Sequence, residues 1–467
     1  MDKLRRLDIA NEYIKLLAEV DSLGKECQSQ LKTSEEGALK AYRQLQTLVI
    51  SLGSLQEGAE GAATHLVDHV SGITQSCHEQ IRSAFSVGME DVLKKIQWPK
   101  ANAGIPISLR EQWTTTVSKL LNFQKPELEA RIKAGEKNKD YKAPVVLLPF
   151  QVLVRPFEMR FKYHFEGDRP TNRLDKPEYF LQHVEDLLNT YSSFVSDELQ
   201  ALLLDQFRGT DIAFNPVYID AASALITSVL PMLRNKLFSI LPAVGNNPQL
   251  LSHLIHELMQ FDTKIRDDWG YTGGYGVEGW NGLAWEVLVQ KDWFGRWLKV
   301  EKDCEYSEMS FSYLILTFDV VALQRYQDII NTPDSGELDF DSVESSSTKP
   351  SKAAIRVNDL LETITDRYRP LASFSQKLRF LIDIQISIFD QFHERLHSAL
   401  EAYLTMTSTI GRRVQGVTNE EYSSLQGVSG LDRLCRVYGS ADYLERAMRD
   451  WSDDIVLILS TPIIFVC

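Results

Sequence analysis

The stretch Arg160–Phe180, RFKYHFEGDRPTNRLDKPEYF, decides the fold of this chain. A basic and aromatic helix end runs into a polar turn, and Pro177 with Glu178 then opens a new helix. Proline suits the first helical turn because the N–H that it lacks would have no partner there. A glutamate at the same end complements the helix dipole. The stretch therefore predicts two helices joined by a turn, and it is not built like a catalytic loop.

Helical patterns separated by short loops continue on both sides of this turn. We expect helices over 145–165, 177–208, 216–241, 248–266, 283–302, 353–368, 370–406 and 430–455. Strand-like alternation of apolar and polar residues is almost absent, which argues against α/β architectures. Thr332–Lys352 is acidic and rich in serine, so we expect a disordered loop there.

The first 98 residues contain three more helical patterns. Over 4–31, apolar residues recur every three or four positions and so share one helical face. A second helix is expected over Glu35–Leu55, and a third carries apolar residues from Ala62 to Phe85. This region is rich in Gln, Glu, Lys and Ala, which favours a coiled coil or a long helical hairpin. An ordinary bundle packed on the rest of the chain is the alternative.

Residues 99–143 separate these helices from the turn. Asn102–Pro106 is expected to be a linker, and Ser108 with Glu111 fits a capping box that opens a helix. Arg131–Lys142 is charged and contains four lysines, which is typical of a solvated loop. We therefore expect a linker with short helices.

Composition excludes several classes of protein. The net charge of −14 argues against a nucleic-acid binder and against broad electrostatic docking on anionic lipid. The five cysteines are scattered and form no CxxC pair, so neither a disulfide framework nor a cysteine zinc site is indicated. The N-terminus lacks a secretory apolar core, and no apolar run reaches the roughly 18 residues needed to span a bilayer. We expect a cytoplasmic protein with peripheral membrane association.

One segment matches a catalytic motif literally. His393-Glu394-Arg395-Leu396-His397 fits H-E-x-x-H, in which two histidines one helical turn apart bind zinc. Glu420 and Glu421 lie at a distance from which a third ligand can come. However, Arg395 stands where zinc proteases usually place an apolar side chain. The surrounding apolar residues, Ile384, Ile388, Phe392 and Leu396, are typical of a packing helix.

Other candidate sites are weaker. His65 and His69, and likewise His253, His256 and Glu257, lack a completing ligand. The glycine-rich segment 270–279 follows no strand and lacks the Lys-Ser/Thr of a phosphate-binding loop, so a flexible loop is expected. We therefore predict no catalytic residue, no metal and no cofactor.

Four blocks, in order, resemble the RINT/TIP family. The first is 160–184, the second Trp293–Lys302, the third runs from Ile364 to Leu381, and the fourth is Ala447–Asp454. The signature residues in these blocks are Arg160, Phe161, Tyr163, His164, Phe165, Pro177, Trp293, Trp297, Asp366, Arg367, Tyr368 and Trp451.

The resemblance implies an all-α fold, an elongated rod of stacked helical bundles of the exocyst-like tether type. It also implies a non-enzymatic subunit of the Dsl (NRZ-type) tethering complex on the cytosolic face of the endoplasmic reticulum. That complex captures COPI vesicles returning from the Golgi and contacts endoplasmic reticulum SNAREs. Family members join the next tether subunit through an N-terminal helical hairpin. Here the candidate partner-binding residues are Leu7, Ala10, Ile14, Leu17, Leu23 and Leu31.

Two segments depart from the family pattern. Cys304–Val321 interrupts the run from the second block into Ala322, and Ile455–Cys467 is an apolar tail where family members continue with further helices. We interpret both as translated intron or gene-model artefacts, with a lineage-specific insertion as the alternative. The expected organisation is 1–98 partner-binding hairpin, 99–143 linker, 144–331 signature bundle, 332–352 loop, 353–455 truncated bundle and 456–467 aberrant tail.

Two other functions stay open. The first is a zinc metalloprotease built on 393–397. The second is a coiled-coil scaffold in checkpoint signalling, unrelated to trafficking.

Overall fold

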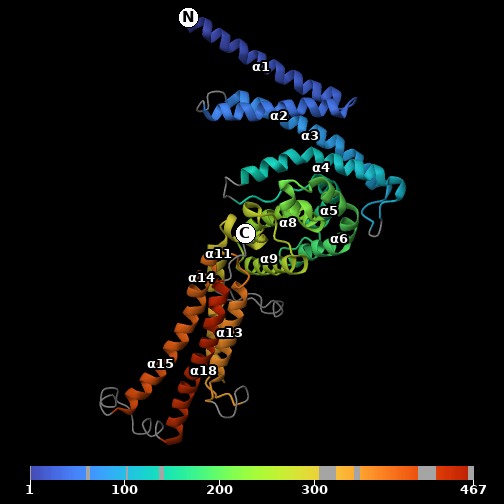
Figure 1. Cartoon of the computed structure of the whole chain (residues 1–467). Coiled ribbons are helices and arrows are strands. Elements are labelled where there is room, and N and C mark those ends of the chain that lie inside the picture. The colour runs from blue at the N-terminus through green and yellow to red at the C-terminus, as the bar shows by residue number, and fades with distance from the viewer. Residues whose placement is uncertain are drawn as a thin grey trace. The chain divides into compact units, whose positions relative to one another are not determined.

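The structure is a computed structural model that describes the backbone of most of the chain. The described residues are 2–58, 64–100, 104–135, 141–303, 322–340, 348–408 and 427–460. Within these ranges every regular element is a helix, and the only strand-like contacts are two isolated bridges, Gly273 with Gly279 and Leu338 with Ser351. The predicted all-α fold is confirmed, and Figure 1 shows the order of the helices.

The chain forms two compact units that alternate along the sequence. Unit 1 contains 1–162, 184–231 and 273–279, and unit 2 contains 163–183, 232–272 and 280–467. The helices α5 (Leu148–Phe165), α6 (Glu178–Phe207) and α8 (Ala221–Val244) contribute residues to both units.

Unit 1 begins with four long helices. These are α1 (Asp2–Gln30), α2 (Glu35–Gly58), α3 (Thr64–Lys95) and α4 (Ile107–Gly135). Helix α1 packs on α2 and α3, and α3 packs on α4. Helix α1 lies close to α3 at Gly24, where an added Cβ would lie 2.9 Å from Ile73. Val20 and Cys27, which flank this glycine on α1, are fully buried, so the second half of α1 belongs to the core of a bundle.

The segment between the two helical regions differs from expectation. Helix α4 has 29 residues, so the expectation of short helices is wrong. Ser108 lies inside this helix because α4 begins at Ile107, and a capping box at Ser108 is therefore also wrong. Arg131 is helical too, and only 136–140 of the expected charged loop lie outside the described residues.

The rest of unit 1 contains short and long helices. The 3₁₀ turn η1 (Asp211–Phe214) and helix α7 (Pro216–Ile219) precede α8. The expected helix over 216–241 is thus broken at Asp220, whose carboxylate accepts a hydrogen bond from the Ser223 N–H at 2.7 Å. Helix α8 is long and apolar enough to cross a membrane, but 72% of its most apolar window is buried inside the protein. Its composition therefore fits a core helix.

The glycine-rich segment is anchored, and the expectation of a flexible loop is wrong. Within unit 1, the buried Glu278 carboxylate pairs with Arg131 and accepts hydrogen bonds from Asn215 at 3.0 Å and Tyr218 at 3.1 Å. A Cβ at Gly274 would lie 2.7 Å from the Asn215 amide, so only glycine fits there. Burial, together with the Glu278 charge, raises the pKa of Tyr218 far above its ordinary value.

Unit 2 contains most of the C-terminal helices. They are α9 (Pro248–Trp269), α10 (Leu283–Trp285), the π-helical turn η3 (Glu286–Gln290), α11 (Phe294–Asp303), α12 (Ala322–Asn331), α13 (Lys352–Tyr368), α14 (Phe374–Phe380), the π-helical turn η4 (Leu381–Ile386), α15 (Ser387–Thr407) and α18 (Gly427–Ser460).

Three boundaries in unit 2 differ from expectation. The expected helix over 283–302 breaks after η3, where Asp292 has a positive φ of 55°. The expected helix over 370–406 begins only at Phe374 and contains a π-helical turn. Helix α18 continues to Ser460, so the start of the apolar tail is helical backbone. Residues 304–321 and 461–467 lie outside the described residues.

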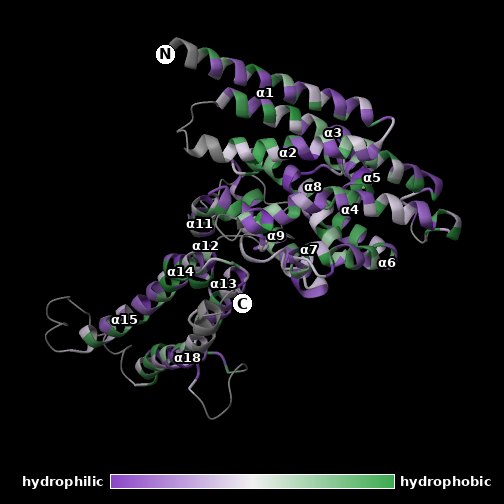
Figure 2. Ribbon diagram, turned by 45° about the horizontal axis from the view of Figure 1, so that its top comes forward, coloured by the Kyte–Doolittle hydropathy of each residue, from purple (hydrophilic) through white to green (hydrophobic). Residues whose placement is uncertain are grey.

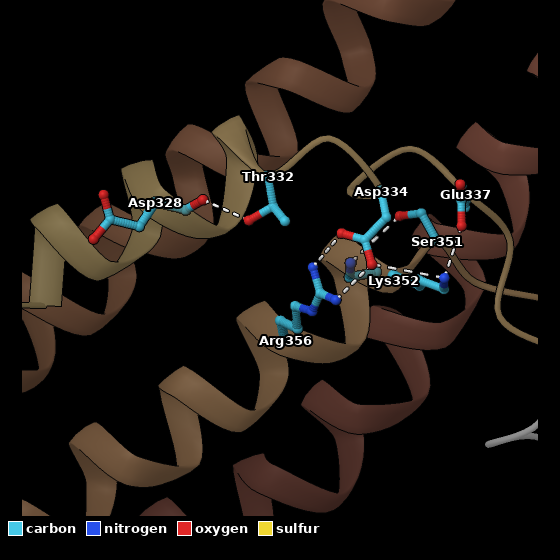
Figure 3. Close-up of polar contacts among 8 residues, drawn as sticks. Asp328, Thr332, Asp334, Glu337, Ser351, Lys352 and Arg356 are labelled. Carbon is cyan, nitrogen blue, oxygen red and sulfur yellow. Dashed lines mark hydrogen bonds and ion pairs between the residues drawn. The ribbon is translucent and has the colours of Figure 1, made fainter.

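The described ends of the acidic segment are ordered, which contradicts a fully disordered loop. Both Asp334 oxygens accept hydrogen bonds from the Arg356 guanidinium at 2.8 Å, and the Lys352 ammonium lies 2.7 Å from Glu337 (Figure 3). Ser351 caps α13 and its backbone N–H donates to the hydroxyl of Ser440 on α18 at 3.0 Å. Residues 341–347 lie outside the described part.

Candidate functional site

The signature turn between α5 and α6 closes around a buried ammonium. Lys236 of α8 donates to the Phe165 carbonyl at 2.6 Å and to the Asn172 side-chain oxygen at 2.5 Å. The Asn172 amide in turn donates to the Gly167 carbonyl at 2.7 Å. Burial lowers the pKa of Lys236, against the opposing effect of the nearby Glu166. All these residues belong to unit 2, so Lys236 fixes the path of the turn inside that unit.

The signature residues of the first block divide into buried and exposed sets. Phe165 packs on the rings of Phe180 and His183, at centroid distances of 6.3 and 5.4 Å. Phe161 and Pro177 are also buried. Tyr163 is exposed, and the Arg169 guanidinium lies 4.3 Å from the centre of its ring. His164 is half-buried and Arg160 is exposed. The buried set shapes the turn, and the exposed set is its outer surface.

The two tryptophans of the second block are packing residues. An added Cβ at Gly245 would lie 2.0 Å from the Trp293 ring, so this ring fits only against a glycine. Trp297 is buried, and its ring centroid lies 5.2 Å from that of Phe380 and 6.0 Å from that of Phe294.

The third block supplies a buried ion pair. Arg367 donates to Glu301 of α11 at 2.7 Å, and the other oxygen of Glu301 accepts a hydrogen bond from Ser252 of α9 at 2.5 Å. Tyr368 is fully buried against Phe380, with ring centroids 5.5 Å apart. Asp366, by contrast, is exposed beside Arg369. A buried carboxylate therefore joins three helices of unit 2.

The fourth block packs against the third. The Trp451 indole of α18 donates to the Thr365 hydroxyl at 3.1 Å. The amide of Gln385 donates to the same hydroxyl at 2.5 Å. Blocks two to four thus meet in one core, and α9 links them to the signature turn because His253, next to Ser252, lies 3.3 Å from Glu178.

The candidate partner-binding face of α1 is divided along the helix. Leu7 and Ile14 are 66% and 63% exposed, and Ala10 is exposed as well. Leu17, Leu23 and Leu31 are half-buried. Hydrophobic and hydrophilic residues alternate along α1 in Figure 2. The first half of α1 therefore presents apolar side chains to solvent, while the second half packs within unit 1.

Comparison with known proteins agrees with the four blocks. A family model described as the RINT-1/TIP-1 family matches residues 148–461, which is more than half of the chain. The chain belongs to this family. The predicted resemblance is thereby confirmed.

Two curated relatives show how the length of this chain compares with that of other family members. A RINT1-like protein of Drosophila melanogaster is 23% identical over 421 residues, or 85% of this chain and 51% of the relative. Protein transport protein tip20 of Schizosaccharomyces pombe is 23% identical over 362 residues, or 74% of this chain and 46% of the relative. The chain therefore spans about half the length of these relatives. No solved structure matches it.

The H-E-x-x-H segment of this family member lies on the surface of α15. His393 and His397 are exposed, and His397 lies 3.8 Å from Glu401. Among the described residues, no group of three His, Cys, Asp or Glu side chains has the arrangement of a metal site. Glu420 and Glu421 lie outside these residues.

Sequence reasoning missed the buried polar residues that organise unit 2. Lys236, Glu301 and Asp262 are each buried. Asp262 accepts hydrogen bonds from the backbone N–H groups of Leu283 at 2.8 Å and Ala284 at 2.9 Å, and so caps α10. Burial raises the pKa of Asp262 to about 7. In the sequence, such a residue can be recognised as a charged residue on an otherwise apolar helical face.

Proposed function

We propose that this chain is a non-enzymatic subunit of a tethering complex at the endoplasmic reticulum. In this role it helps to capture COPI vesicles in Golgi-to-endoplasmic-reticulum retrograde transport, and it contacts endoplasmic reticulum SNAREs. It reaches the cytosolic face of the membrane through its partners, without binding nucleic acid. The observation that carries the proposal is the match of residues 148–461 to the RINT-1/TIP-1 family. The name of the fission-yeast relative, a protein transport protein, supports the same process.

The arrangement of the signature residues supports a scaffold role. Most of them are buried or half-buried, and they pack against other core residues or close the turn around Lys236. Such residues specify the helical core, and the function then belongs to exposed surfaces. The H-E-x-x-H histidines are exposed on one helix, which favours a surface role over zinc chemistry. Metal analysis tests this point: stoichiometric zinc that disappears in a His393→Gln, His397→Gln variant would overturn it.

We propose that the first half of α1 contacts the neighbouring tether subunit. Leu7 and Ile14 lie two helical turns apart on the same face, and both are more than half exposed. Burial of such a side chain contributes roughly 1.5–3 kcal/mol to association. Leu17 is less suitable for a test because it is already half-buried within unit 1.

The test is a quantitative co-purification of the full chain from cells. A Leu7→Asp, Ile14→Asp variant should bind the neighbouring subunit about a hundredfold more weakly, since two losses of roughly 1.5 kcal/mol give about 3 kcal/mol. Val428→Asp with Leu431→Asp is the matched control, because both residues are exposed apolar residues on α18, which belongs to unit 2. If the variant and the control retain tether subunits equally, α1 is not the contact. If the unaltered chain recovers neither tether subunits nor SNAREs, the proposed function itself fails.

A further inference from the structure

Helix α15 carries a row of aromatic and apolar side chains that are exposed except for the half-buried Phe389. The row begins with three rings: Phe389 stacks on His393 with centroids 6.5 Å apart, and His393 lies 6.4 Å from His397. Leu400 and Leu404, the latter 53% exposed, continue the same row. We call Phe389, His393, His397, Leu400 and Leu404 the α15 ridge.

The other side of α15 is occupied by the core of unit 2. Ile388 and Phe392 are fully buried, and each precedes a ridge residue by one position. Because successive helical residues are about 100° apart around the axis, the ridge lies directly beside this buried face. The exposed part of the ridge, from His393 to Leu404, therefore lies outside the packing of α15 against its own unit.

A row of carboxylates borders the ridge on its outer edge. Asp390, Glu394 and Glu401 each follow a ridge residue by one position, so they lie one step further round the helix. All three are exposed, and no described residue forms an ion pair with Asp390 or Glu394. We call these three residues the acidic rim. Around the axis of α15, the buried face is therefore followed by the α15 ridge, and the ridge is followed by the acidic rim.

We propose that the α15 ridge binds one amphipathic helix of a partner protein, whose apolar stripe covers the ridge and whose basic flank faces the acidic rim. Helices recognise such surfaces through apolar residues at i, i+3, i+4 and i+7. Complementary charges at the edge select the partner and its orientation. An antiparallel pair of two copies would place the acidic rims side by side, which disfavours self-association. Under this proposal, His393 and His397 belong to a partner-binding ridge, and their spacing matches the H-E-x-x-H motif without forming a zinc site.

The ridge is long enough for a defined probe. Residues 389–404 extend over about 24 Å of helix at 1.5 Å per residue. The probe is a labelled 20-residue helical peptide with leucines at i, i+3, i+4 and i+7 and lysines on one flank. A second peptide is identical except that glutamates replace these lysines. Fluorescence anisotropy with the full chain should show at least tenfold tighter binding of the lysine peptide.

Two variants locate the site. Leu400→Ser with Leu404→Ser removes the apolar contact and should weaken binding of the lysine peptide at least tenfold. The matched control is Val428→Ser with Leu431→Ser, two exposed apolar residues on α18 that lie off the ridge. Asp390→Lys with Glu394→Lys should reverse the preference, so that the glutamate peptide binds more tightly. Glu36→Lys with Glu111→Lys, which changes the net charge equally at exposed positions of unit 1, should leave the preference as it was.

Three outcomes would overturn the proposal. One is equal binding of the two peptides, and another is an equal loss in the ridge variant and its α18 control. The third is concentration-dependent dimerisation that the ridge variant abolishes, since it would assign the ridge to a second copy of this chain. The experiment does not involve α1, so its failure leaves the proposed contact of α1 and the proposed function untouched.

Discussion

The first half of α1 and the signature core of unit 2 both have apolar residues at helical spacing. These residues are exposed on α1 and buried in unit 2. On α1, Leu7 and Ile14 recur with helical spacing and stay exposed. In unit 2, Trp297 of α11 and Tyr368 of α13 lie on more strongly amphipathic helices and are buried against Phe380. The difference lies in the polar residues: the signature core contains buried paired charges, whereas the ion pair described in the first half of α1, Lys15 with Glu12, is exposed and lies within that helix. Helical spacing therefore identifies a face, and buried polar partners identify a core.

The largest expected effect comes from removing one partner of the buried ion pair. Arg367→Met leaves the Glu301 carboxylate buried with only Ser252 as a partner, which should destabilise unit 2 by about 3–5 kcal/mol. The measurement is denaturant unfolding of the full chain followed by circular dichroism. Arg369→Met is the control, since Arg369 pairs with the exposed Asp366 and should cost less than about 1 kcal/mol.

A double substitution sharpens this result. Arg367→Met with Glu301→Leu replaces both charges by apolar groups, and it should be more stable than Arg367→Met alone. Equal stability of the single and double variants would mean that the carboxylate is not the source of the loss. Leu7→Asp on α1, by contrast, should leave the unfolding midpoint almost unchanged because that position is exposed.

The next effect concerns shape complementarity in the signature core. Gly245→Val places side-chain atoms where the Trp293 ring lies, so we expect a destabilisation of about 1–3 kcal/mol. Gly295→Ala, at a helical glycine with open space around it, should instead stabilise α11 by up to about 1 kcal/mol. Both values follow from unfolding midpoints. A neutral Gly245→Val variant would show that Trp293 moves aside freely and is not a packing anchor.

Part of this core was predictable from the sequence. Periodicity predicted the all-α fold and located most helices, because apolar spacing depends on local residues. The partners of Glu301 and Glu278 were not predictable, since Arg367 and Arg131 are 66 and 147 residues away and meet them only in the folded unit. The glycine-rich segment looked flexible for the same reason. Helix ends such as the break at Asp220 depend on a single capping side chain, which the apolar pattern does not report.

A pH titration tests a second buried carboxylate of unit 2. The folded-state pKa of Asp262 is raised to about 7 from 3.8, so the folded chain holds a proton that the unfolded chain releases. This proton stabilises the fold below pH 4, and the contribution is lost as the pH rises from about 4 to 7, at about 1.4 kcal/mol per pH unit. Asp262→Asn should flatten this part of the stability profile. Asp366→Asn, at an exposed position, is the control and should leave the profile's slope unchanged.

The smallest expected effect on folding comes from deleting residues 304–321. Their removal joins Asp303 at the end of α11 directly to Ala322 at the start of α12. Without them, Ala322 falls three positions after Glu301, and Tyr326 and Ile330 follow at intervals of four. All four residues are buried, so α11 and α12 would form one continuous helix with a single buried face.

The described residues already place the two helix ends together. Glu301 and Ala322 line one small cavity with Ile364 and Arg367, so a direct connection requires little movement. We predict that the deletion preserves helicity by circular dichroism and improves solubility, since it removes the apolar run Tyr313–Leu316. Deletion of 305–321 is the control: it shifts the register by about 100° and should lower the unfolding midpoint. A lower midpoint for the 18-residue deletion than for the 17-residue one would show that 304–321 belongs to the core of unit 2.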